Sequence, residues 1–593
     1  MLLEENKSKV CVSVKNKKWT KIPCDHALAN SIKQKLEIPY EIAEILSRKK
    51  LTPEELQSYL NPKLKNLLSN TTPLLDINKA ASIVADAIKS QKKIAVFGDY
   101  DVDGATSSAL IKRFLQSIGH DAQIYIPDRV FEGYGPNIEA LKKLHKDGAS
   151  VIITVDCGSS SHDTIEKAKK LGLTIIVIDH HMCGGNLPKA DAIVNPNRED
   201  DQSGYGYLAA VGVSFLFVIE LCKKLTAENL LQGYSPDLLS LLDLVALGTV
   251  CDVVPLVDAN RALVKQGTKV IESRMNTGIK ALLDVSRVTT DISTYHLGFA
   301  LGPRINAGGR VGKSSLGSEL LVSNDYAAAM EIALKLDTYN GERKAIEMKV
   351  LEEALEFASA IDTKFPIICV ADEGWHQGVI GIVAGRLKDR YNKPAAVISF
   401  DKEGIGKASC RSIDGIDFGK AVIEAKKKGI LLNGGGHTMA AGFTVHKEKL
   451  QELQDFFIDS FQDIYNKLAK KKVHYFDSYI SIDSANIEFI KYINKLGPFG
   501  NSNSQPRFIL KNVSVVHANI LKGDHISCII TEFGKGSSNT SLRAIAFGAI
   551  QNPIGEVLLA KKYNLNLLVT LDINKWQGNE NPQIVIHDAL IEN

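Results

Sequence analysis

Short apolar runs alternate with helical patterns between about residues 90 and 195, and no other feature constrains the fold as strongly. Each apolar run has the length of a buried strand, and the segments between the runs have helical spacing. Buried strands joined by helical crossovers form a parallel sheet that is covered on both faces. The sequence therefore predicts an α/β fold with a parallel sheet. The expected strands lie at 93–97, 122–127, 150–155 and 173–178, and the expected helices at 105–118, 137–147 and 163–171.

Three of these runs end in carboxylates and imidazoles. The first run leads into GDYDVDG (98–104), the third is followed by Asp156, and the fourth ends in DHH (179–181). In parallel sheets of this kind, ligands bind beyond the carboxyl ends of the strands. The side chains are therefore expected to meet at one edge of one sheet. A later apolar segment, 241–256, adds Asp252.

These residues form a plausible metal site. Asp101 and Asp103 are one residue apart, so at an extended strand end both carboxylates would face the same cation. Asp156, His180 and Asp252 would complete two sites that share a bridging carboxylate. This ligand set suits Mn²⁺ and also Mg²⁺, and two such ions can activate water and stabilise charge on a phosphoryl group. Singly, an Asp-x-Asp pair is usually an N-cap or a turn and a histidine pair is often packing, but five ligand-type residues at one sheet edge favour the metal.

Two other motifs do not support nucleotide chemistry. The segment AGGRVGKS (307–314) has Ala307 where a Walker A loop needs glycine, and no buried strand leads into it. The Gly133-Tyr134-Gly135 segment continues with Pro136, which does not suit a dinucleotide-binding turn. ATP hydrolysis and hydride transfer therefore lose their main support.

Composition narrows the class of protein further. The net charge of +3 is too small to indicate nucleic-acid binding, so any basic surface must be local. The nine cysteines include no Cys-x-x-Cys pair, which argues against a disulfide framework and favours a reducing cytoplasm. The N-terminus carries charges where a signal peptide needs an apolar core. The most apolar stretch, 241–257, contains Asp243 and Asp252, so no membrane span is expected.

The rest of the chain suggests further domains. Thr52-Pro53-Glu54-Glu55 has the pattern of a capping box at a helix start within a helical lead-in. A long helix with apolar residues at helical spacing precedes a second α/β region. Short strands toward the C-terminus suggest a small β-barrel, similar to an OB-fold. The expected domains are 1–75 (helical lead-in), 76–330 (catalytic), 331–362 (connecting helix), 363–470 (second α/β) and 471–593 (barrel).

The motifs resemble those of the DHH phosphoesterase family over about residues 40 to 593. GDYDVDG, TVDCG, IDHH and ALGTVCDVVPL resemble, in order, the family's phosphoesterase motifs. A second set is similar to the branch of single-stranded-DNA exonucleases, and LGPFGNSNSQPRF (496–508) resembles the entry to its OB-fold. The resemblance implies that the second α/β region is a DHHA1-like substrate-binding domain. The second set is PDRVFEGYG (127–135), GPRINAGGR (302–310), GWHQGVIGIVAGRL (374–387), ASCRSIDGID (408–417) and GGGHTMAAGF (434–443).

The resemblance implies roles residue by residue. His181 would face the scissile phosphate, and Asp99 and Asp179 would support or complete the metal shell. Tyr134 could stack on a base. The implied metal ligands are Asp101, Asp103, Asp156, His180 and Asp252. The implied substrate-binding residues are Arg129, Tyr134, Arg304, Asn306, His376, Ser409, Arg411, Gly435, Gly436 and His437.

Some of these positions have a simpler alternative. Gly434 to Gly436, with His437 beside them, would offer a backbone nest for an anion, and the simpler alternative is a tight turn. Trp375 could be functional or part of a core. Cys157 and Cys251, next to two implied ligands, are expected to fill space beside the site, with inhibition through their oxidation as the weaker alternative.

The function implied by the resemblance is a 5′-to-3′ exonuclease that hydrolyses single-stranded DNA to mononucleotides in repair and recombination. Single-strand-binding protein and a helicase are candidate partners, and a cytoplasmic monomer is expected. One alternative is a small-substrate DHH phosphodiesterase acting on oligoribonucleotides or cyclic dinucleotides. Another is a non-catalytic DHH replication scaffold. The expected C-terminal barrel disfavours the first alternative, and the complete set of ligand-type residues disfavours the second.

Overall fold

The chain forms two compact units in the computed structural model. Unit 1 consists of Met1–Asn70, Pro255–Lys265 and Lys472–Asn593, and unit 2 consists of Thr71–Val254 and Gln266–Lys471. The structure describes residues 12–62, 64, 73–129, 131–289, 291–361, 364–469, 473–521, 523–534, 540–550, 552–576 and 578–592.

Unit 2 contains the parallel sheet that the apolar runs predict. Its strand order is β3-β2-β4-β5-β6, and every pair of neighbours is parallel. The short fifth strand, β6, was not expected, because its three apolar residues are too few to stand out in the sequence. The strands are β2 (Ile94–Gly98), β3 (Ala122–Tyr125), β4 (Val151–Val155), β5 (Thr174–Ile178) and β6 (Ala192–Val194).

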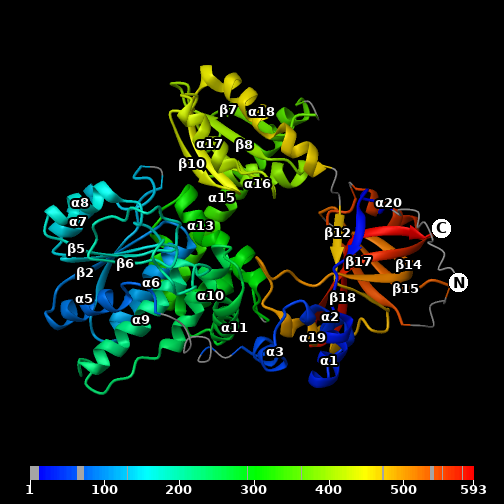
Figure 1. Cartoon of the computed structure of the whole chain (residues 1–593), viewed down its shortest axis with the longest axis horizontal. Helices are drawn as coiled ribbons and strands as arrows, with labels where there is room; N and C mark the ends of the chain where they lie inside the picture. Colours follow the sequence, from blue (N-terminus) through cyan, green and yellow to red (C-terminus); the bar gives the residue numbers. More distant parts are fainter. Residues whose placement is uncertain are drawn as a thin grey trace. The chain divides into compact units, whose positions relative to one another are not determined.

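Helices cover both faces of this sheet, as Figure 1 shows. Helices α7 and α8 pack on one face, where Leu141 and Ile165 join a core with Phe97, Ile152 and Val177 of the strands. Helices α5, α6 and α9 lie on the other face. The bounds are α5 (Ile77–Lys89), α6 (Val102–Ser117), α7 (Ile138–Lys146), α8 (His162–Lys170) and α9 (Ala210–Ala227).

A helical region follows the sheet. The apolar segment 241–256 is mostly helix α10, and AGGRVGKS overlaps helix α13 rather than a phosphate-binding loop. The elements are η1 (Leu238–Leu241), α10 (Leu242–Cys251), α11 (Asp258–Glu272), α12 (Thr277–Val285), η2 (His296–Leu301), α13 (Gly302–Val311) and α14 (Leu316–Val322).

The expected long helix is α15 (Tyr326–Ser359), which leads to a second, mixed sheet of order β10-β11-β9-β8-β7. Successive side chains of β8 point to opposite faces of this sheet, and each face has its own core. Ile398 packs with α17 and α18 on one face, whereas Val397 packs with α15, α16 and Trp375 on the other. Trp375 is therefore a core residue. The elements are β7 (Ile368–Glu373), α16 (Ile380–Tyr391), β8 (Ala395–Phe400), β9 (Ile405–Arg411), α17 (Phe418–Lys427), β10 (Asn433–His437), β11 (Ala440–His446), η3 (Lys447–Lys449) and α18 (Leu450–Ala469).

Unit 1 contains the C-terminal barrel. Strands β14, β15, β16, β18 and β17 pair in succession, and an additional pairing of β14 with β17 completes the circuit. A five-stranded circuit of this kind is the OB architecture that the sequence predicts. The elements are β12 (Val473–Phe476), β13 (Ser478–Ile480), α19 (Ile487–Leu496), β14 (Phe508–Leu521), β15 (His525–Glu532), β16 (Leu542–Ala546), α20 (Pro553–Ala560), β17 (Asn564–Trp576) and β18 (Asn579–Glu592).

The N-terminal segment packs against this barrel. Ile32, Ile42 and Leu46 share one buried core with Phe489 and Phe508. The expectation of a wholly helical lead-in was wrong in one respect, because β1 (Lys18–Lys21) is a strand that pairs in parallel with β12. The predicted capping box is present at Thr52 and Glu55. The helices are α1 (His26–Leu36), α2 (Tyr40–Ser47) and α3 (Pro53–Leu60).

No helix in the described part of the chain is long and apolar enough to cross a membrane.

Candidate active site

The turn from β2 into α6 positions two carboxylates. Asp101 is the N-cap of α6, and its Oδ1 accepts hydrogen bonds from Asp103 N at 2.9 Å and Gly104 N at 3.1 Å. The expectation that Asp101 and Asp103 lie on an extended strand end was wrong, because the helix begins at Val102. Gly104 allows this tight return, since a Cβ there would collide with the backbone of Asp99.

Asp103 is held by the N-terminus of a different helix. Its two oxygens accept from Ala210 N at 2.7 Å and Val211 N at 2.9 Å, where α9 begins. Burial, reinforced by the charge of Asp101, raises the pKa of Asp103 to about 7. These long-range backbone contacts immobilise the carboxylate.

His180 presents one ring nitrogen to three carboxylates. Its Nδ1 lies 3.1 Å from Leu208 O and must carry the proton, because a carbonyl oxygen only accepts. Its Nε2 therefore presents a lone pair. That atom lies 3.4 Å from Asp156 Oδ1, 3.5 Å from Asp252 Oδ2 and 3.9 Å from Asp103 Oδ2. Burial lowers the pKa of His180 to about 4, which keeps the ring neutral as a metal ligand requires.

Four buried atoms at this point have no hydrogen-bond partner. They are Asp99 Oδ1, Asp156 Oδ1, His180 Nε2 and Asp252 Oδ2. Leaving a buried polar atom unpaired costs about 1–3 kcal/mol, and more when the group is charged. Several such atoms side by side therefore point to a cation that satisfies them.

The electrostatics support the same conclusion. Burial and the neighbouring carboxylates raise the pKa of Asp252 to about 9 and the pKa values of Asp99 and Asp156 well above their usual range. A divalent cation would remove this repulsion. Oxygen ligands with one neutral imidazole fit Mn²⁺ or Mg²⁺.

The possible ligands fall into overlapping groups. Asp99, Asp101 and Asp156 lie within reach of one ion, and Asp103, His180 and Asp252 lie within reach of another. Asp156 also groups with His180 and His181. Asp156 thus lies where a bridging ligand would be needed.

Asp179 and His181 form an ion pair beside this cluster. His181 Nδ1 donates to Asp179 Oδ1 at 2.7 Å, and Asp179 also accepts from Ser159 N. Burial alone would raise the pKa of Asp179, but the hydrogen bond and charge of His181 outweigh it and lower the value to about 2. Burial likewise opposes protonation of His181, and Asp179 overcomes this and raises its pKa. The Tyr134 hydroxyl donates to Asp156 O at 3.1 Å and lies 3.3 Å from His181 Nδ1.

A second feature of unit 2 is a cationic pocket of about 370 Å³. It brings together three of the expected residues, Arg129, Ser409 and Arg411. None of the described residues that line it is acidic. The lining is Tyr100, Arg129, Arg310, Gln377, Gly378, Ile380, Gly381, Lys407, Ala408, Ser409, Arg411 and Gly442.

The guanidinium groups of the pocket are fixed by neutral partners. Arg129 lies over the ring of Tyr100, 5.0 Å from its centroid. Arg310 donates to Gly378 O at 2.8 Å and Arg411 to Cys410 O at 2.9 Å. Burial, followed by repulsion from neighbouring arginines including Arg129 and Arg411, lowers the pKa of Arg310 to about 10. Crowded, desolvated cations of this kind suit a phosphate group.

The comparisons with known proteins agree with this arrangement. The DHH family N-terminal domain matches residues 93–249, the DHHA1 domain matches 363–463, and the RecJ OB domain matches 476–588. The single-stranded-DNA-specific exonuclease RecJ of Haemophilus influenzae is 34% identical over 89% of this chain and 92% of its own length. The chain belongs to the RecJ family.

Two further RecJ proteins support the assignment. RecJ of Escherichia coli is 35% identical over 86% of this chain and 90% of its own length. The structure of RecJ from Thermus thermophilus in complex with Mn²⁺ superposes with a TM-score of 0.77 at 25% identity, covering 97% of this chain and 79% of that chain. The resemblance seen in the motifs and the expected fold class are both confirmed.

Not every residue expected in a RecJ-type site meets the pocket. Arg304 forms an ion pair with Asp337 at 2.8 Å and donates to Ala300 O, and Asn306 lies half-buried on the same helix. His376 accepts from Gly378 N in its own turn. None of these three lines the pocket.

The glycine segment is neither a nest nor a tight turn. Gly435, Gly436 and His437 belong to strand β10, an edge strand that pairs antiparallel with β11 from Asn433 to His437. The extended pairing separates successive N–H groups to opposite sides, so they do not converge on one anion as a nest requires.

Arg310 was not expected in the pocket, although it is the last residue of the motif GPRINAGGR (302–310). In an α-helix, positions six apart lie about 240° around the axis from one another. Arg304 and Arg310 of α13 therefore point in different directions, and only one of them can face the pocket. Helical spacing shows that the two differ, but the fold decides which arginine faces the pocket.

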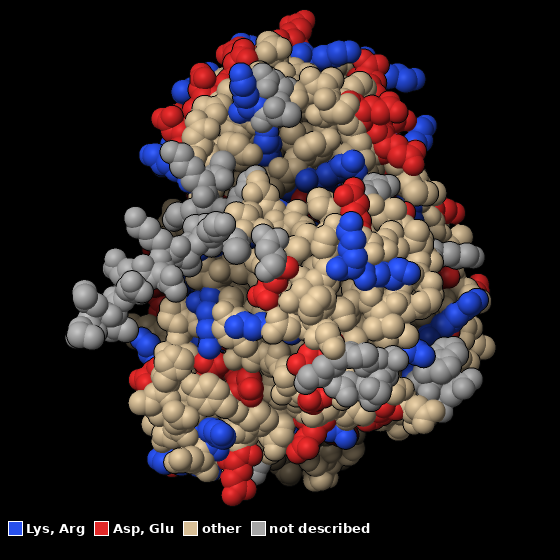
Figure 2. Space-filling view, turned by 90° about the vertical axis from the view of Figure 1, so that its right-hand side faces the viewer, with Lys and Arg blue, Asp and Glu red and all other residues tan. Residues whose placement is uncertain are grey.

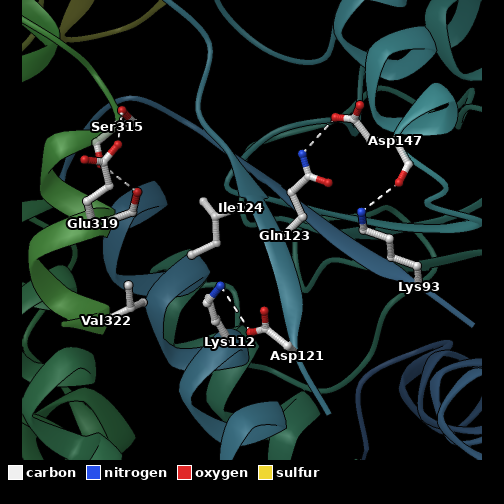
Figure 3. A pocket seen from close by; sticks show the side chains of 10 residues that line it. Lys93, Lys112, Asp121, Gln123, Ile124, Asp147, Ser315, Glu319 and Val322 are labelled. Carbon is white, nitrogen blue, oxygen red and sulfur yellow. Dashed lines mark hydrogen bonds and ion pairs between the residues drawn. The ribbon is translucent and has the colours of Figure 1, made fainter. Parts of the chain in front are cut away.

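A larger cavity of about 790 Å³ lies elsewhere in unit 2, beside the edge strand β3. Figure 3 shows that its polar side chains pair with one another or with nearby backbone. Lys112 contacts Asp121 at 3.2 Å, and Gln123 donates to Asp147 at 3.1 Å. This cavity therefore has less unpaired charge than the arginine pocket.

On the face of the molecule in Figure 2, basic and acidic side chains are interspersed, in keeping with the small net charge.

Proposed function

We propose that this chain is a divalent-metal-dependent exonuclease that degrades single-stranded DNA from its 5′ end to mononucleotides, in DNA repair and recombination. The observation that carries the proposal is the cluster of four orphaned, buried ligand atoms in the same unit as a cationic pocket. The relatives' names supply the substrate class, since the RecJ proteins of both H. influenzae and E. coli are named single-stranded-DNA-specific exonucleases.

The metal ions would be held by five residues, Asp101, Asp103, Asp156, His180 and Asp252. When bound, divalent cations lower the pKa of water and neutralise charge on a phosphodiester. The chain's own residues keep the ligands in place. Helix α9 fixes Asp103, and Leu208 O fixes the ring of His180 so that its lone pair faces the site.

The ion pair of Asp179 and His181 would act on the substrate. Asp179 keeps His181 cationic, so the imidazolium can hydrogen-bond a non-bridging phosphate oxygen or give a proton to the leaving oxygen. Tyr134, with its hydroxyl within reach of His181, would help to orient the ring. Asp99, with an unpaired oxygen, would complete the shell.

Polarity would come from the arginine pocket. Tyr100 lies between Asp99 and Asp101 in the sequence and also forms a wall of the pocket, so the pocket adjoins the metal cluster. With its 5′-phosphate bound by Arg129, Arg310 and Arg411, the strand would present its first phosphodiester to the cluster. Hydrolysis of that bond would release one nucleotide at a time.

The remaining assignments follow from the proposed function. The described cysteines are free thiols, which suits the reducing cytoplasm where DNA repair enzymes act. The proposed partners are single-strand-binding protein and a helicase. The proposed oligomeric state is a monomer, and light scattering of the purified protein would test it. A small-substrate phosphodiesterase would not account for the barrel of unit 1. A non-catalytic scaffold would not account for the metal ligands.

The test is cleavage of oligonucleotides labelled at either end, single- or double-stranded, by purified protein with Mn²⁺. We expect loss of mononucleotides from the 5′ end of single strands. Asp156→Ala should abolish turnover because it removes the shared ligand, with a circular dichroism spectrum like that of the wild type. Full turnover by folded Asp156→Ala would overturn the metal assignment, and digestion from the 3′ end would overturn the polarity.

A further inference from the structure

Unit 1 contains a cluster of metal-ligating side chains that the proposed nuclease reaction does not use. Cys24 and His26 flank the N-cap residue of α1, and Glu44 lies on α2. Cys24 Sγ is 3.3 Å from Glu44 Oε1 and 3.7 Å from His26 Nδ1, and His26 Nδ1 is 3.9 Å from Glu44 Oε1. The three ligand atoms can therefore reach one ion.

Two of these three distances match the edges of a tetrahedral zinc site. With Zn–S near 2.3 Å, Zn–N near 2.05 Å and Zn–O near 2.0 Å, tetrahedral angles place the ligand atoms about 3.3–3.6 Å apart. The Cys24–Glu44 and Cys24–His26 separations of 3.3 and 3.7 Å lie within about 0.2 Å of their S–O and S–N edges, whereas the His26–Glu44 separation of 3.9 Å exceeds the N–O edge by about 0.6 Å. His26 Nδ1 lies 2.8 Å from the Tyr40 hydroxyl, and the 69% exposed side chain would exchange this contact for the metal by rotating toward Glu44.

The carboxylate of the cluster is already oriented. Glu44 is fully buried, and the Ser478 hydroxyl of β13 donates to its Oε2. This leaves Oε1 facing Cys24 and His26. Lys21 donates to the same oxygen at 2.7 Å and is the counter-ion of Glu44 in the absence of a metal. Its side chain is about one-third exposed and flexible, so it can move into solvent when a cation arrives.

We propose that Cys24, His26 and Glu44 bind one Zn²⁺ ion, with water as the fourth ligand. On binding, the Cys24 thiol loses its proton to solvent and the thiolate sulfur bonds to the metal, so each ion bound releases one proton. A thiolate selects a softer metal than the carboxylate cluster of unit 2, which keeps the two sites chemically distinct. The ion would link α1 and α2 of the N-terminal segment, and through Glu44 and Ser478 it would support the C-terminal barrel.

The probe is Co²⁺ added to the full-length, metal-free protein, because a thiolate–Co²⁺ bond gives a near-ultraviolet charge-transfer absorption. We expect this absorption to reach the amplitude of one thiolate-bound Co²⁺ per chain in the wild type and in Cys222→Ser, a partly exposed cysteine of α9 outside the cluster, because Co²⁺ bound by the carboxylates of unit 2 gives no such band. It should be absent from Cys24→Ser. An absorption missing from the wild type, or unchanged in Cys24→Ser, would overturn the proposal.

Zinc affinity gives a second readout. Changes that only surround a metal ligand already weaken binding about 10–100-fold, so loss of the ligand in His26→Ala should weaken Zn²⁺ by at least that factor. The catalytic cluster is kept saturated with Mg²⁺ during this titration. His26 is exposed, so the variant should fold, and nuclease activity on short oligonucleotides should be unchanged. Equal Zn²⁺ affinity in His26→Ala would refute the site independently of the proposed nuclease function.

Discussion

Arg310 and Arg304 illustrate how single residues acquire roles in this protein. Both belong to one helix and one motif, yet only Arg310 reaches the arginine pocket. Arg304 is neutralised by Asp337. The proposed recognition of a 5′-phosphate therefore depends on a residue that the motif did not single out.

Replacing these two arginines separately tests the pocket. Because a hydrogen bond to a charged group contributes about 1.5–3 kcal/mol, Arg310→Ala should raise KM for a 5′-phosphorylated oligonucleotide about 10- to 100-fold. Arg304→Ala is the matched control and should change KM little. The measurement compares 5′-phosphorylated with 5′-hydroxyl substrates. If Arg304→Ala has the larger effect on this preference, the phosphate is bound elsewhere.

The acidic cluster makes a prediction about metal removal and pH. The folded pKa values of Asp103, about 7, and Asp252, about 9, lie above the unfolded value near 4. Between these values the folded state retains protons that the unfolded state has lost, so stability must fall as pH rises from about 4 to 9. We expect the metal-free protein to show this decline in melting temperature, and Mn²⁺ to suppress it. A decline of equal size with and without Mn²⁺ would contradict the assignment.

At the scale of elements, strand β10 shows how close packing limits a glycine segment. Gly436 has a φ of 155°, and a Cβ there would lie 2.5 Å from Ala441 Cα on the paired strand β11. Gly435, its neighbour, has open space where its Cβ would be. The two glycines therefore differ in structural demand, although the sequence presents them as equivalent.

Alanine at each position tests this difference in structural demand. Gly436→Ala should lower the free energy of unfolding by about 1–3 kcal/mol, the usual cost of overpacking. Gly435→Ala should leave stability within about 0.5 kcal/mol of the wild type, as surface changes usually do. Thermal unfolding measures both. Equal melting temperatures for the two variants would show that the strand pairing yields more easily than the structure indicates.

At the scale of the whole molecule, unit 1 is assembled from segments that are far apart in the sequence. Ile32 and Leu46 from the N-terminal helices are buried in the same core as Phe508 of the barrel. Removing the chain after about residue 470 would strip these side chains of their partners as well as removing the barrel. Truncation is therefore a poor test of DNA binding by the barrel, and an exposed barrel residue is a better one.

Phe547 offers that test. It follows β16, is 56% exposed and packs edge-on against His525. Because stacking on a base contributes about 1–3 kcal/mol, Phe547→Ala should weaken binding of long single strands by about 5- to 150-fold, with short substrates cleaved normally. Adding Arg543→Ala should also flatten the log–log salt slope by about 0.7 if that side chain contacts one phosphate. Tyr234→Ala, which changes a comparably exposed aromatic residue of unit 2, is the control. Unchanged DNA binding by both Phe547 variants would show that single strands bind to another surface.

The sequence alone was enough to predict the parallel sheet, the long helix, the barrel and the convergence of Asp156 and His180. These predictions succeed because short apolar runs and helical spacing reflect local burial, and parallel strands carry their carboxyl ends to one edge. Only the tertiary structure decided that Asp103 accepts hydrogen bonds from the N-terminus of α9, and that Arg310 rather than Arg304 lines the pocket. It also decided that residues 12–62 share a core with the barrel. These outcomes depend on contacts between segments up to several hundred residues apart, and local patterns carry no information about which distant backbone or helix face a side chain will meet.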